Sequence, residues 1–322
     1  MQKEIIVKDI VYRFVHVPPL CQKFMDTKEF NRLRNIKQLG LSYIVYPSAV
    51  HTRFEHSLGV MELAGRVAKH LSQHLTERER DLLQLGALFH DAGHVAFSHL
   101  MDYILEEQGF SKEIAHHENR SISMLRHINS RLNLLTEREI GMIADMILGK
   151  HEGKEKPFLY QIVSNKLCGI DVDRMDYLQR DLKHVDMPCF QADYILECMK
   201  VDEQGNLAFR HKAEEELRSL FEARRRLLLL VCRHKGVLNA EKLIREALSS
   251  LNITEEWFTK NWGGVDDCYM LCELRRIRPD IMERLYERQW PEVTEEEQKK
   301  YLYCVERDDI DEQMKKINWA KN

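Results

Sequence analysis

The 322-residue sequence lacks the long apolar run of a membrane-spanning helix, which needs about 20 consecutive apolar residues to cross a bilayer. Its longest apolar stretch is only Leu227–Cys232. The polar segment Met1–Glu4 also lacks the features of a signal peptide, since an acidic residue stands where basic residues belong. We therefore expect a cytoplasmic protein that makes no use of a membrane.

The eight cysteines include no Cys-x-x-Cys pair, and a reduced, cytosolic setting fits them best. The formal net charge is only −4, so the chain as a whole does not attract nucleic acid strongly. Nucleic acid is thus a possible but not a favoured partner, and a local basic pocket for phosphate groups remains open. The hydrophobic fraction of 44% and the charged fraction of 31% are typical of a globular protein.

Histidine is the residue type with the unusual distribution. Nine of the 15 histidines fall between positions 51 and 117, where an even spread would put about three. The clustering is the first indication of a functional site, and it directs attention to this part of the chain.

Helical periodicity dominates the sequence and predicts an all-α fold with one minor β-hairpin. Thr-x-x-Glu capping boxes at Thr76 and Thr136 predict the starts of helices that run to His90 and to Leu148. The hairpin is expected within Val201–Phe209, around Gly205. Further helices are expected at residues 26–39, 57–75, 171–184, 213–235 and 237–251.

The chain is expected to divide into two parts. Residues 1–250 are predicted to form the catalytic core, and residues 251–322 a charged helical C-terminal subdomain. The signals for this division are the Trp262-Gly263-Gly264 sequence and the strong charge beyond it. The second part could also serve as an oligomerisation surface.

A candidate metal site lies at residues 90–94, with the sequence HDAGH, where a helix is expected to end. Adjacent residues in mid-helix point about 100° apart, but a turn at Gly93 would let the first two face one point. His56 and Asp173, each at an expected helix start, could supply further ligands. Imidazole nitrogen combined with carboxylate oxygen suits Fe, Mn, Zn or Co, and leaves room for water and a phosphoryl oxygen.

With these residues the chain resembles the HD superfamily of phosphohydrolases. Within that superfamily it resembles the catalytic core of the deoxynucleoside triphosphate (dNTP) triphosphohydrolases that carry a sterile-alpha-motif and an HD domain. The matching segments occur in family order and are RLRNIKQLG (32–40), HTRFEHSLGV (51–60), LFHDAGHVAFSH (88–99), HHE (116–118), DVDRMDYLQRD (171–181) and RHK (233–235). They span residues 26 to 250, without a sterile-alpha-motif domain and with a much shortened C-terminal lobe.

The resemblance implies a role for each matching residue. The metal ligands would be His56, His90, Asp91 and Asp173. The catalytic group would comprise His94, His99 and His117 with the carboxylate of Asp102, and His99 would be the favoured acid. The triphosphate would be bound by Arg53, Arg174 and Arg224, and the sugar by Gln38, Leu39, Tyr177 and Asp181.

The same resemblance places a regulatory nucleotide near Asp26, Asn31, Arg34 and Lys235, and implies a homo-oligomer, either a dimer or a tetramer. The chain departs from the family at three points. Asn31 stands where a glutamine is expected, the DPIHG segment is replaced at residues 7–12, and Cys232 stands in place of an active-site tyrosine. The departures concern nucleotide-activated assembly and the sugar contacts rather than the metal chemistry.

The expected reaction is the hydrolysis of a dNTP to a deoxynucleoside and inorganic triphosphate, by attack of water at the α-phosphorus. A divalent transition metal would be required, with Mg as a further ion on the triphosphate. Two alternatives stay open. The first is a phosphohydrolase or phosphodiesterase for nucleoside monophosphates, cyclic nucleotides or nucleic-acid ends. The second is a nucleotide-sensing scaffold that does no chemistry.

Overall fold

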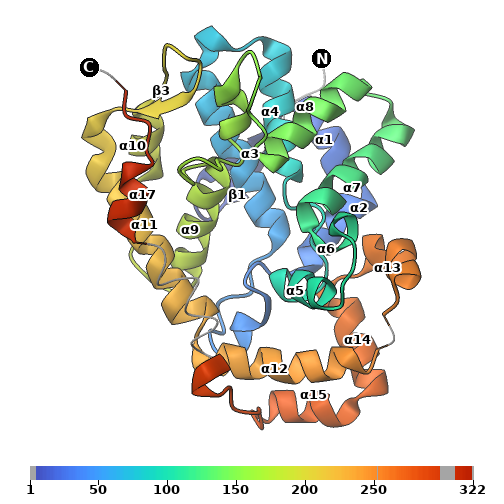
Figure 1. Ribbon diagram of the computed structural model, residues 1–322. Coiled ribbons are helices and arrows are strands. Elements are labelled where there is room, and N and C mark those ends of the chain that lie inside the picture. Colours follow the sequence, from blue (N-terminus) through green and yellow to red (C-terminus); the bar gives the residue numbers. More distant parts are fainter. Residues whose placement is uncertain (1–4, 252, 298–308, 321–322) are drawn as a thin grey trace.

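The computed structural model describes residues 5–251, 253–297 and 309–320. It is mainly helical, as predicted, with two small antiparallel pairs of strands (Figure 1). The strands are β1 (Ile5–Asp9), β2 (Arg13–Val17), β3 (Met199–Val201) and β4 (Leu207–Phe209). The α-helices are α1 (Pro19–Met25), α2 (Lys28–Asn31), α3 (Arg53–His70), α4 (Glu77–Phe89), α5 (His99–Glu107), α6 (Lys112–Ala115), α7 (His117–Leu132), α8 (Glu137–Leu148), α9 (Val172–His184), α10 (Ala192–Glu197), α11 (Glu214–Leu227), α12 (Lys235–Ser249), α13 (Glu255–Asn261), α14 (Asp267–Ile277), α15 (Pro279–Tyr286) and α17 (Ile310–Lys315).

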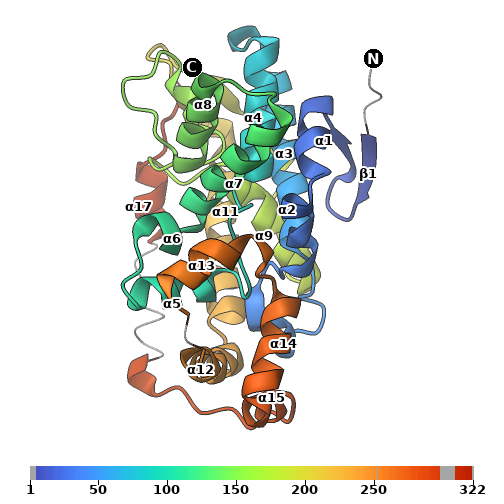
Figure 2. The same ribbon diagram turned by 90° about the vertical axis from the view of Figure 1, so that its right-hand side faces the viewer.

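Helix α3 runs through the middle of the molecule (Figure 1). Its apolar side chains divide between two hydrophobic clusters: Val60 and Leu63 pack with α9 and α11, whereas Leu58 and Met61 pack with α1, α4 and α8. A helix that is buried on most sides needs apolar or small residues around most of its circumference, and α3 has them. Figure 2 shows the N-terminal hairpin and α17 on opposite sides of this centre.

A third hydrophobic cluster joins helices from both sides of the predicted boundary at residue 250. Leu243 and Ile244 of α12 pack in this cluster with Met270 of α14, Leu285 of α15 and Met101 of α5. The division into two domains stays a prediction, and residues 298–300 of the charged run at 295–300 lie outside the described residues. Within the described part of the chain, no helix is both long and apolar enough to cross a membrane.

The two capping boxes are confirmed. The hydroxyl groups of Thr76 and Thr136 accept hydrogen bonds from the backbone N–H of Glu79 and Glu139, and each glutamate accepts a bond from the threonine N–H in return. Helix α8 ends at Gly149, which adopts the left-handed conformation with φ of 65°. The predicted hairpin is also confirmed, because β3 and β4 pair across a turn that contains Gly205.

The helix predicted at residues 26–39 is wrong. Only Lys28–Asn31 is α-helical, a 3₁₀ turn covers Arg32–Asn35, and the backbone is extended at Ile36. Tertiary contacts override the local pattern here. The buried Arg32 side chain donates to backbone carbonyls of the loop after α4, and the Ile36 carbonyl accepts from the backbone N–H of Arg53 at 2.9 Å. The β1–β2 hairpin was not predicted either.

A buried charge network anchors α9 against α3. The Arg180 side chain is fully buried and pairs with Asp176 through Nε and NH2, each at 3.0 Å, and with Asp9 of β1 at 2.8 Å. Gly59 of α3 leaves the space for this network, since a Cβ atom at that position would lie 1.8 Å from Asp176 Oδ1. The glycine is thus required by close approach rather than by its backbone conformation.

We predict that Gly59→Ala lowers the free energy of unfolding by about 3 kcal/mol, because the added methyl group displaces a buried ion pair. Gly141→Ala in α8 is the matched control, since a Cβ atom there would meet nothing within 4 Å. The control should stabilise the protein by roughly 0.5–1 kcal/mol, as alanine is the better helix former. Urea denaturation measures both changes, and equal effects of the two substitutions would contradict the network's role.

Candidate active site

The structure brings the four predicted metal ligands together. His56 lies in the first turn of α3, His90 and Asp91 follow α4, and Asp173 lies in the first turn of α9. The Nε2 atoms of His56 and His90 are 3.2 Å apart and lie 3.1 and 3.3 Å from Asp173 Oδ1. Both Nε2 atoms are also 3.5 Å from a carboxylate oxygen of Asp91. Four side chains from three helices thus direct their ligand atoms toward one point.

The Nδ1 atoms of His56 and His90, which face away from this point, each have a hydrogen-bond partner. His90 Nδ1 donates to the carbonyl of Ala87 at 2.8 Å, and His56 Nδ1 lies 2.8 Å from the carboxylate of Asp176. These partners fix the tautomer, so in the neutral ring Nε2 carries a lone pair toward the centre. Two lone pairs and two carboxylates in such proximity repel one another unless a proton or a metal ion lies between them. The donor set therefore fits a divalent transition metal.

The titration properties of this cluster reflect the same crowding. Burial alone would lower the pKa of His56, but hydrogen bonds with Asp173 and Asp176 raise it well above its usual value. Burial would likewise raise the pKa of Asp173, yet the neighbouring His90 and His56 hold it well below its usual range. Each imidazole stabilises the ionised carboxylate, and each carboxylate stabilises a positive charge at the centre.

The loop after α4 turns sharply because it packs directly against α7. A Cβ atom on Gly93 would lie 2.1 Å from the His117 carbonyl, so only glycine fits. Ser121 of α7 clamps the turn by accepting from the Gly93 N–H and donating to the His90 carbonyl, each at 2.8 Å. Arg120 adds a bond from Nε to the Gly93 carbonyl at 2.8 Å. The sequence predicted the turn, but the requirement for glycine comes from α7 rather than from a positive φ.

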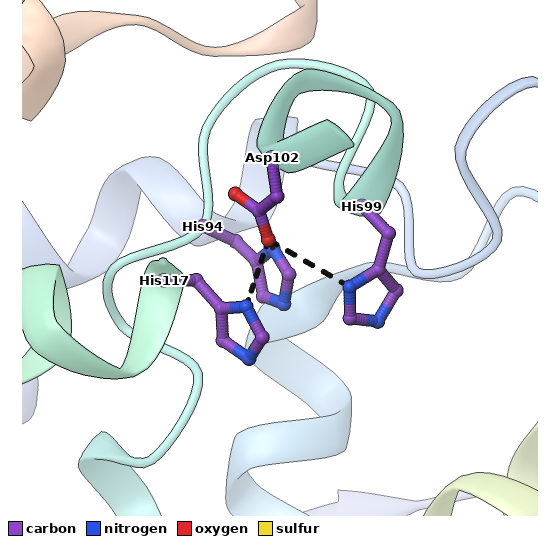
Figure 3. Close-up of side chains that lie close together, drawn as sticks. All are labelled: His94, His99, Asp102 and His117. Atoms are coloured by element: carbon purple, nitrogen blue, oxygen red, sulfur yellow. Dashed lines mark hydrogen bonds and ion pairs between the residues drawn. The ribbon is translucent and has the colours of Figure 1, made fainter. Parts of the chain in front are cut away.

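A second cluster lies beside the first and comprises His94, His99, Asp102 and His117 (Figure 3). Asp102 is its centre: Oδ2 is 2.8 Å from His117 Nδ1 and 3.7 Å from His99 Nδ1, and Oδ1 accepts from Arg120. The His94 and His117 rings stack with centroids 3.9 Å apart. His94 Nε2 and His117 Nε2 lie 3.5 and 3.6 Å from Asp91 Oδ1, which joins the two clusters.

The three histidines of the second cluster differ in their pKa. Burial lowers the pKa of His94 well below its usual value, and the positive charges of Arg53 and His117 add to this effect. Burial also lowers the pKa of His99, although Asp102 opposes the shift. The pKa of His117 is raised, because its hydrogen bond with Asp102 outweighs burial. The two stacked rings thus shift in opposite directions: His94 favours the neutral form, and Asp102 favours the protonated form of His117.

One cavity of about 320 Å³ borders both clusters. Most of the predicted substrate-binding residues line it, and they are Gln38, Leu39, Arg53, Tyr177, Asp181 and Arg224. Arg53 lies between the clusters, where its guanidinium pairs with Asp91 and donates from Nε to Ser98 Oγ at 3.1 Å. Arg174 is not among the described residues that line the cavity, and it packs against Gly169.

The four predicted regulatory residues lie in two places. Asp26, Asn31 and Arg34 lie in the first place. Asn31 Oδ1 accepts a hydrogen bond from Arg34 Nε at 2.9 Å, and Asp26 directly follows α1. Lys235 lies at the start of α12, where its Nζ is 3.4 Å from a carboxylate oxygen of Glu292. The binding of a regulatory nucleotide by these four residues stays a prediction.

Sequence reasoning missed several residues that hold the site in place. His51 is buried and its Nε2 lies 2.7 Å from Asp181 Oδ1, which fixes that carboxylate at the cavity wall. Asp176 and Arg180 carry a local signal, the i, i+4 spacing of opposite charges on one helix. That spacing could have identified the pair from the sequence.

Asp267, which starts α14, is the least expected of the missed residues. Its carboxylate is almost fully buried and accepts from the backbone N–H groups of Lys37 and Phe97 at 3.0 and 2.8 Å. Phe97 and Ser98 both have positive φ, of 62° and 54°, directly before His99. A non-glycine backbone in this region is strained, and it persists only when neighbouring contacts hold it. A residue far along the chain thus fixes the two loops that carry Gln38 and His99.

Comparison with known protein families matches residues 53–181 of this chain to the HD domain. This chain contains an HD domain. The match begins at the Arg53 that borders both clusters and ends at Asp181 on the cavity wall. The HD domain therefore includes all four predicted metal ligands and the whole of the second cluster.

Several curated proteins similar to this chain carry the same activity in their names. The deoxynucleoside triphosphate triphosphohydrolase SAMHD1 homolog of Dictyostelium discoideum is 37% identical over 255 residues, which are 76% of this chain and 49% of that protein. SAMHD1 of Bos taurus, with the same enzyme name, is 37% identical over 246 residues, 67% of this chain and 42% of that protein. For SAMHD1 of Homo sapiens the identity is 35% over 262 residues, 71% and 42%. The match thus spans about half the length of each relative or less.

We predict that Asp176→Asn lowers the affinity of the HD domain for its metal by about 10- to 100-fold, because the carboxylate behind His56 orients and polarises that ligand. Asp145→Asn is the matched control, since Asp145 pairs with Lys154 away from the site. Metal content after competition with a chelator measures the effect. Equal metal retention by the two variants would show that Asp176 does not support the metal.

We also predict that Asp267→Ala costs about 3 kcal/mol of unfolding free energy, because it leaves two backbone N–H groups without an acceptor. The control, Asp266→Ala, removes the N-cap of the same helix together with a hydrogen bond from Asn35 Nδ2, and it should cost about 1 kcal/mol. Chemical denaturation of both variants gives the comparison. A smaller loss for Asp267→Ala than for its neighbour would contradict the clamping role.

Proposed function

We propose that this protein is a metal-dependent dNTP triphosphohydrolase, which converts a dNTP and water into a deoxynucleoside and inorganic triphosphate. The observation that carries the proposal is the single cavity in which Asp91 and Asp173 of the metal cluster, two further histidines and three arginines converge. The enzyme name shared by the similar proteins points to the same reaction. A triphosphate carries about four negative charges, and such a cavity supplies the fixed positive charge that these require.

His56, His90, Asp91 and Asp173 would hold the metal, for which Fe, Mn, Zn and Co all suit the donor set. When bound, the metal polarises a phosphoryl oxygen and activates water. Mg is proposed as a further ion on the triphosphate. Arg53 bridges the two clusters, so it would orient the α-phosphate while its bond to Asp91 keeps that ligand ionised.

In the proposed reaction, the oxygen of water forms a bond to the α-phosphorus and the bond from phosphorus to the sugar O5′ breaks. The leaving O5′ needs a proton, and we assign its delivery to His99, which is half exposed and borders the cavity. Burial lowers the pKa of His99, but a bound triphosphate raises it by its negative charge. His117, whose pKa is raised by Asp102, would stay protonated and stabilise the charge that develops on the phosphate.

The sugar would lie against Gln38 and Leu39, with Tyr177 and Asp181 at the 3′-hydroxyl. All four residues border the cavity. Asp181 suits this role because His51 holds it in place, and its carboxylate keeps acceptor capacity for a hydroxyl group. Arg174 and Arg224 are proposed for the far phosphates. The predicted homo-oligomer and the cytoplasmic location stay predictions.

The proposal predicts that the metal-loaded protein releases deoxynucleoside and inorganic triphosphate in equal amounts from a dNTP. Chromatography after incubation with Mn or Fe and each dNTP detects both products. Asp102→Asn should lower kcat by about 100-fold or more, since the neutral amide lacks the negative charge with which Asp102 raises the pKa of His117. A deoxynucleoside monophosphate or diphosphate as the sole product would contradict this reaction and favour a different phosphohydrolase.

A further inference from the structure

One part of the cavity wall has no role in the proposed reaction. Arg233 and Glu241 border the same cavity as the two clusters, and Cys232 lies beside them. Arg233 follows the π-helical turn Leu228–Cys232, and Glu241 lies in α12. A partly buried carboxylate in a cavity proposed to bind a triphosphate needs explanation, because it would repel that part of the ligand.

The Arg233–Glu241 wall is continuous with the proposed sugar subsite. Asp181 of that subsite, Cys232 and Glu241 all line the same cavity. α12 packs against the 3₁₀ turn Gly40–Ile44, which directly follows Leu39. In Figure 1, α12 begins near the lower end of α11 and runs below α5. Since a dNTP carries its base and its triphosphate on different carbons of the sugar, this wall is in a position to meet the base.

The carboxyl group of Glu241 is in an environment that disfavours its ionised form. Burial raises its pKa to about 7, although Arg233 and Arg245 oppose the shift. Arg245 is directed elsewhere, since its NH1 donates to Glu107 of α5 at 2.6 Å. Two N–H donors supplied by a ligand would stabilise the ionised carboxylate at this position.

We propose that Arg233 and Glu241 read the base of the substrate and make the enzyme prefer dGTP. This inference rests on the proposed function and deepens it. Guanine presents two adjacent donors, N1–H and the N2 amino group, which match the two oxygens of one carboxylate. Its O6 and N7 acceptors match an arginine, the most frequent specific partner of guanine. No other DNA base offers both features.

The same chemistry ranks the other substrates. Adenine and cytosine each offer a single amino group to the Glu241 carboxylate and should be accepted less well. Thymine offers only N3–H between two carbonyl oxygens, which the carboxylate repels, so TTP should be the poorest substrate. A site built to hydrogen-bond a ligand discriminates strongly against an analogue that leaves its buried polar groups without partners.

The test measures kcat/KM for the four dNTPs with the unaltered protein, with Glu241→Gln and with the control Glu246→Gln. Glu246 lies on the exposed face of the same helix and pairs with Arg278. We expect the unaltered protein and the control to prefer dGTP over TTP by about tenfold or more, which corresponds to 1.4 kcal/mol. In Glu241→Gln the ratio should fall below about threefold. If that variant does not fold, Arg233→Gln tests the same contact from its other side.

Binding separates this inference from the proposed function. Calorimetry with dGTP and with TTP, in the presence of a chelator, compares their affinities without turnover. Hydrolysis of all four dNTPs with equal kcat/KM supports the proposed function and overturns the base preference. Equal affinities of dGTP and TTP overturn it as well. If no dNTP is hydrolysed but dGTP still binds more tightly than TTP, the base preference holds and the proposed function fails.

Discussion

Every part of the site depends on buried aspartates that each require a matched positive partner. Asp91 pairs with Arg53, Asp102 with Arg120, and Asp176 with Arg180. A buried carboxylate without such a partner would be costly or would take up a proton. Arg180 lowers the pKa of Asp176, His90 and Arg53 together lower that of Asp91, and the histidines around Asp102 lower its pKa. The ionised carboxylates can then act on the histidines: Asp91 and Asp176 on His56, and Asp102 on His117. The chemistry of the imidazoles thus depends on these ion pairs, and two of them, Asp102–Arg120 and Asp176–Arg180, have no contact with substrate in the proposed reaction.

The ion pairs also position the elements of the fold. Arg180 ties α9 to β1 through Asp9, Arg120 ties α7 to α5 and to the turn at Gly93, and Arg53 joins α3 to the loop after α4. Asp267 adds a contact from the C-terminal part by fixing the loops at Lys37 and Phe97. The metal ligands and the second histidine cluster therefore share a framework, since Asp91 belongs to one and lies within 3.6 Å of histidines of the other. Displacement of a helix or loop in this framework would therefore move both the metal-ligand group and the second histidine cluster.

Local signals in the sequence were sufficient for the elements that local interactions specify. The capping boxes at Thr76 and Thr136 depend on residues three apart, so the sequence predicts both helix starts. That His56, His90, Asp91 and Asp173 lie together could be predicted from residue type, helix ends and family resemblance, and their role as metal ligands stays a prediction. The segment at residues 26–39 could not, because Arg32 and Ile36 bond to residues far along the chain. Asp267 is an ordinary acidic residue in the sequence, and only the fold reveals that it holds two loops.

The central claim is that water attacks the α-phosphorus and that the deoxynucleoside is the leaving group. Hydrolysis of a dNTP in ¹⁸O-labelled water, followed by mass spectrometry of both products, tests it most directly. The account predicts one ¹⁸O atom in the inorganic triphosphate and none in the deoxynucleoside. Label in the deoxynucleoside would mean that a carbon–oxygen bond breaks, and label in a nucleotide product would mean that pyrophosphate or phosphate, not the deoxynucleoside, is the leaving group. Either result would contradict the account.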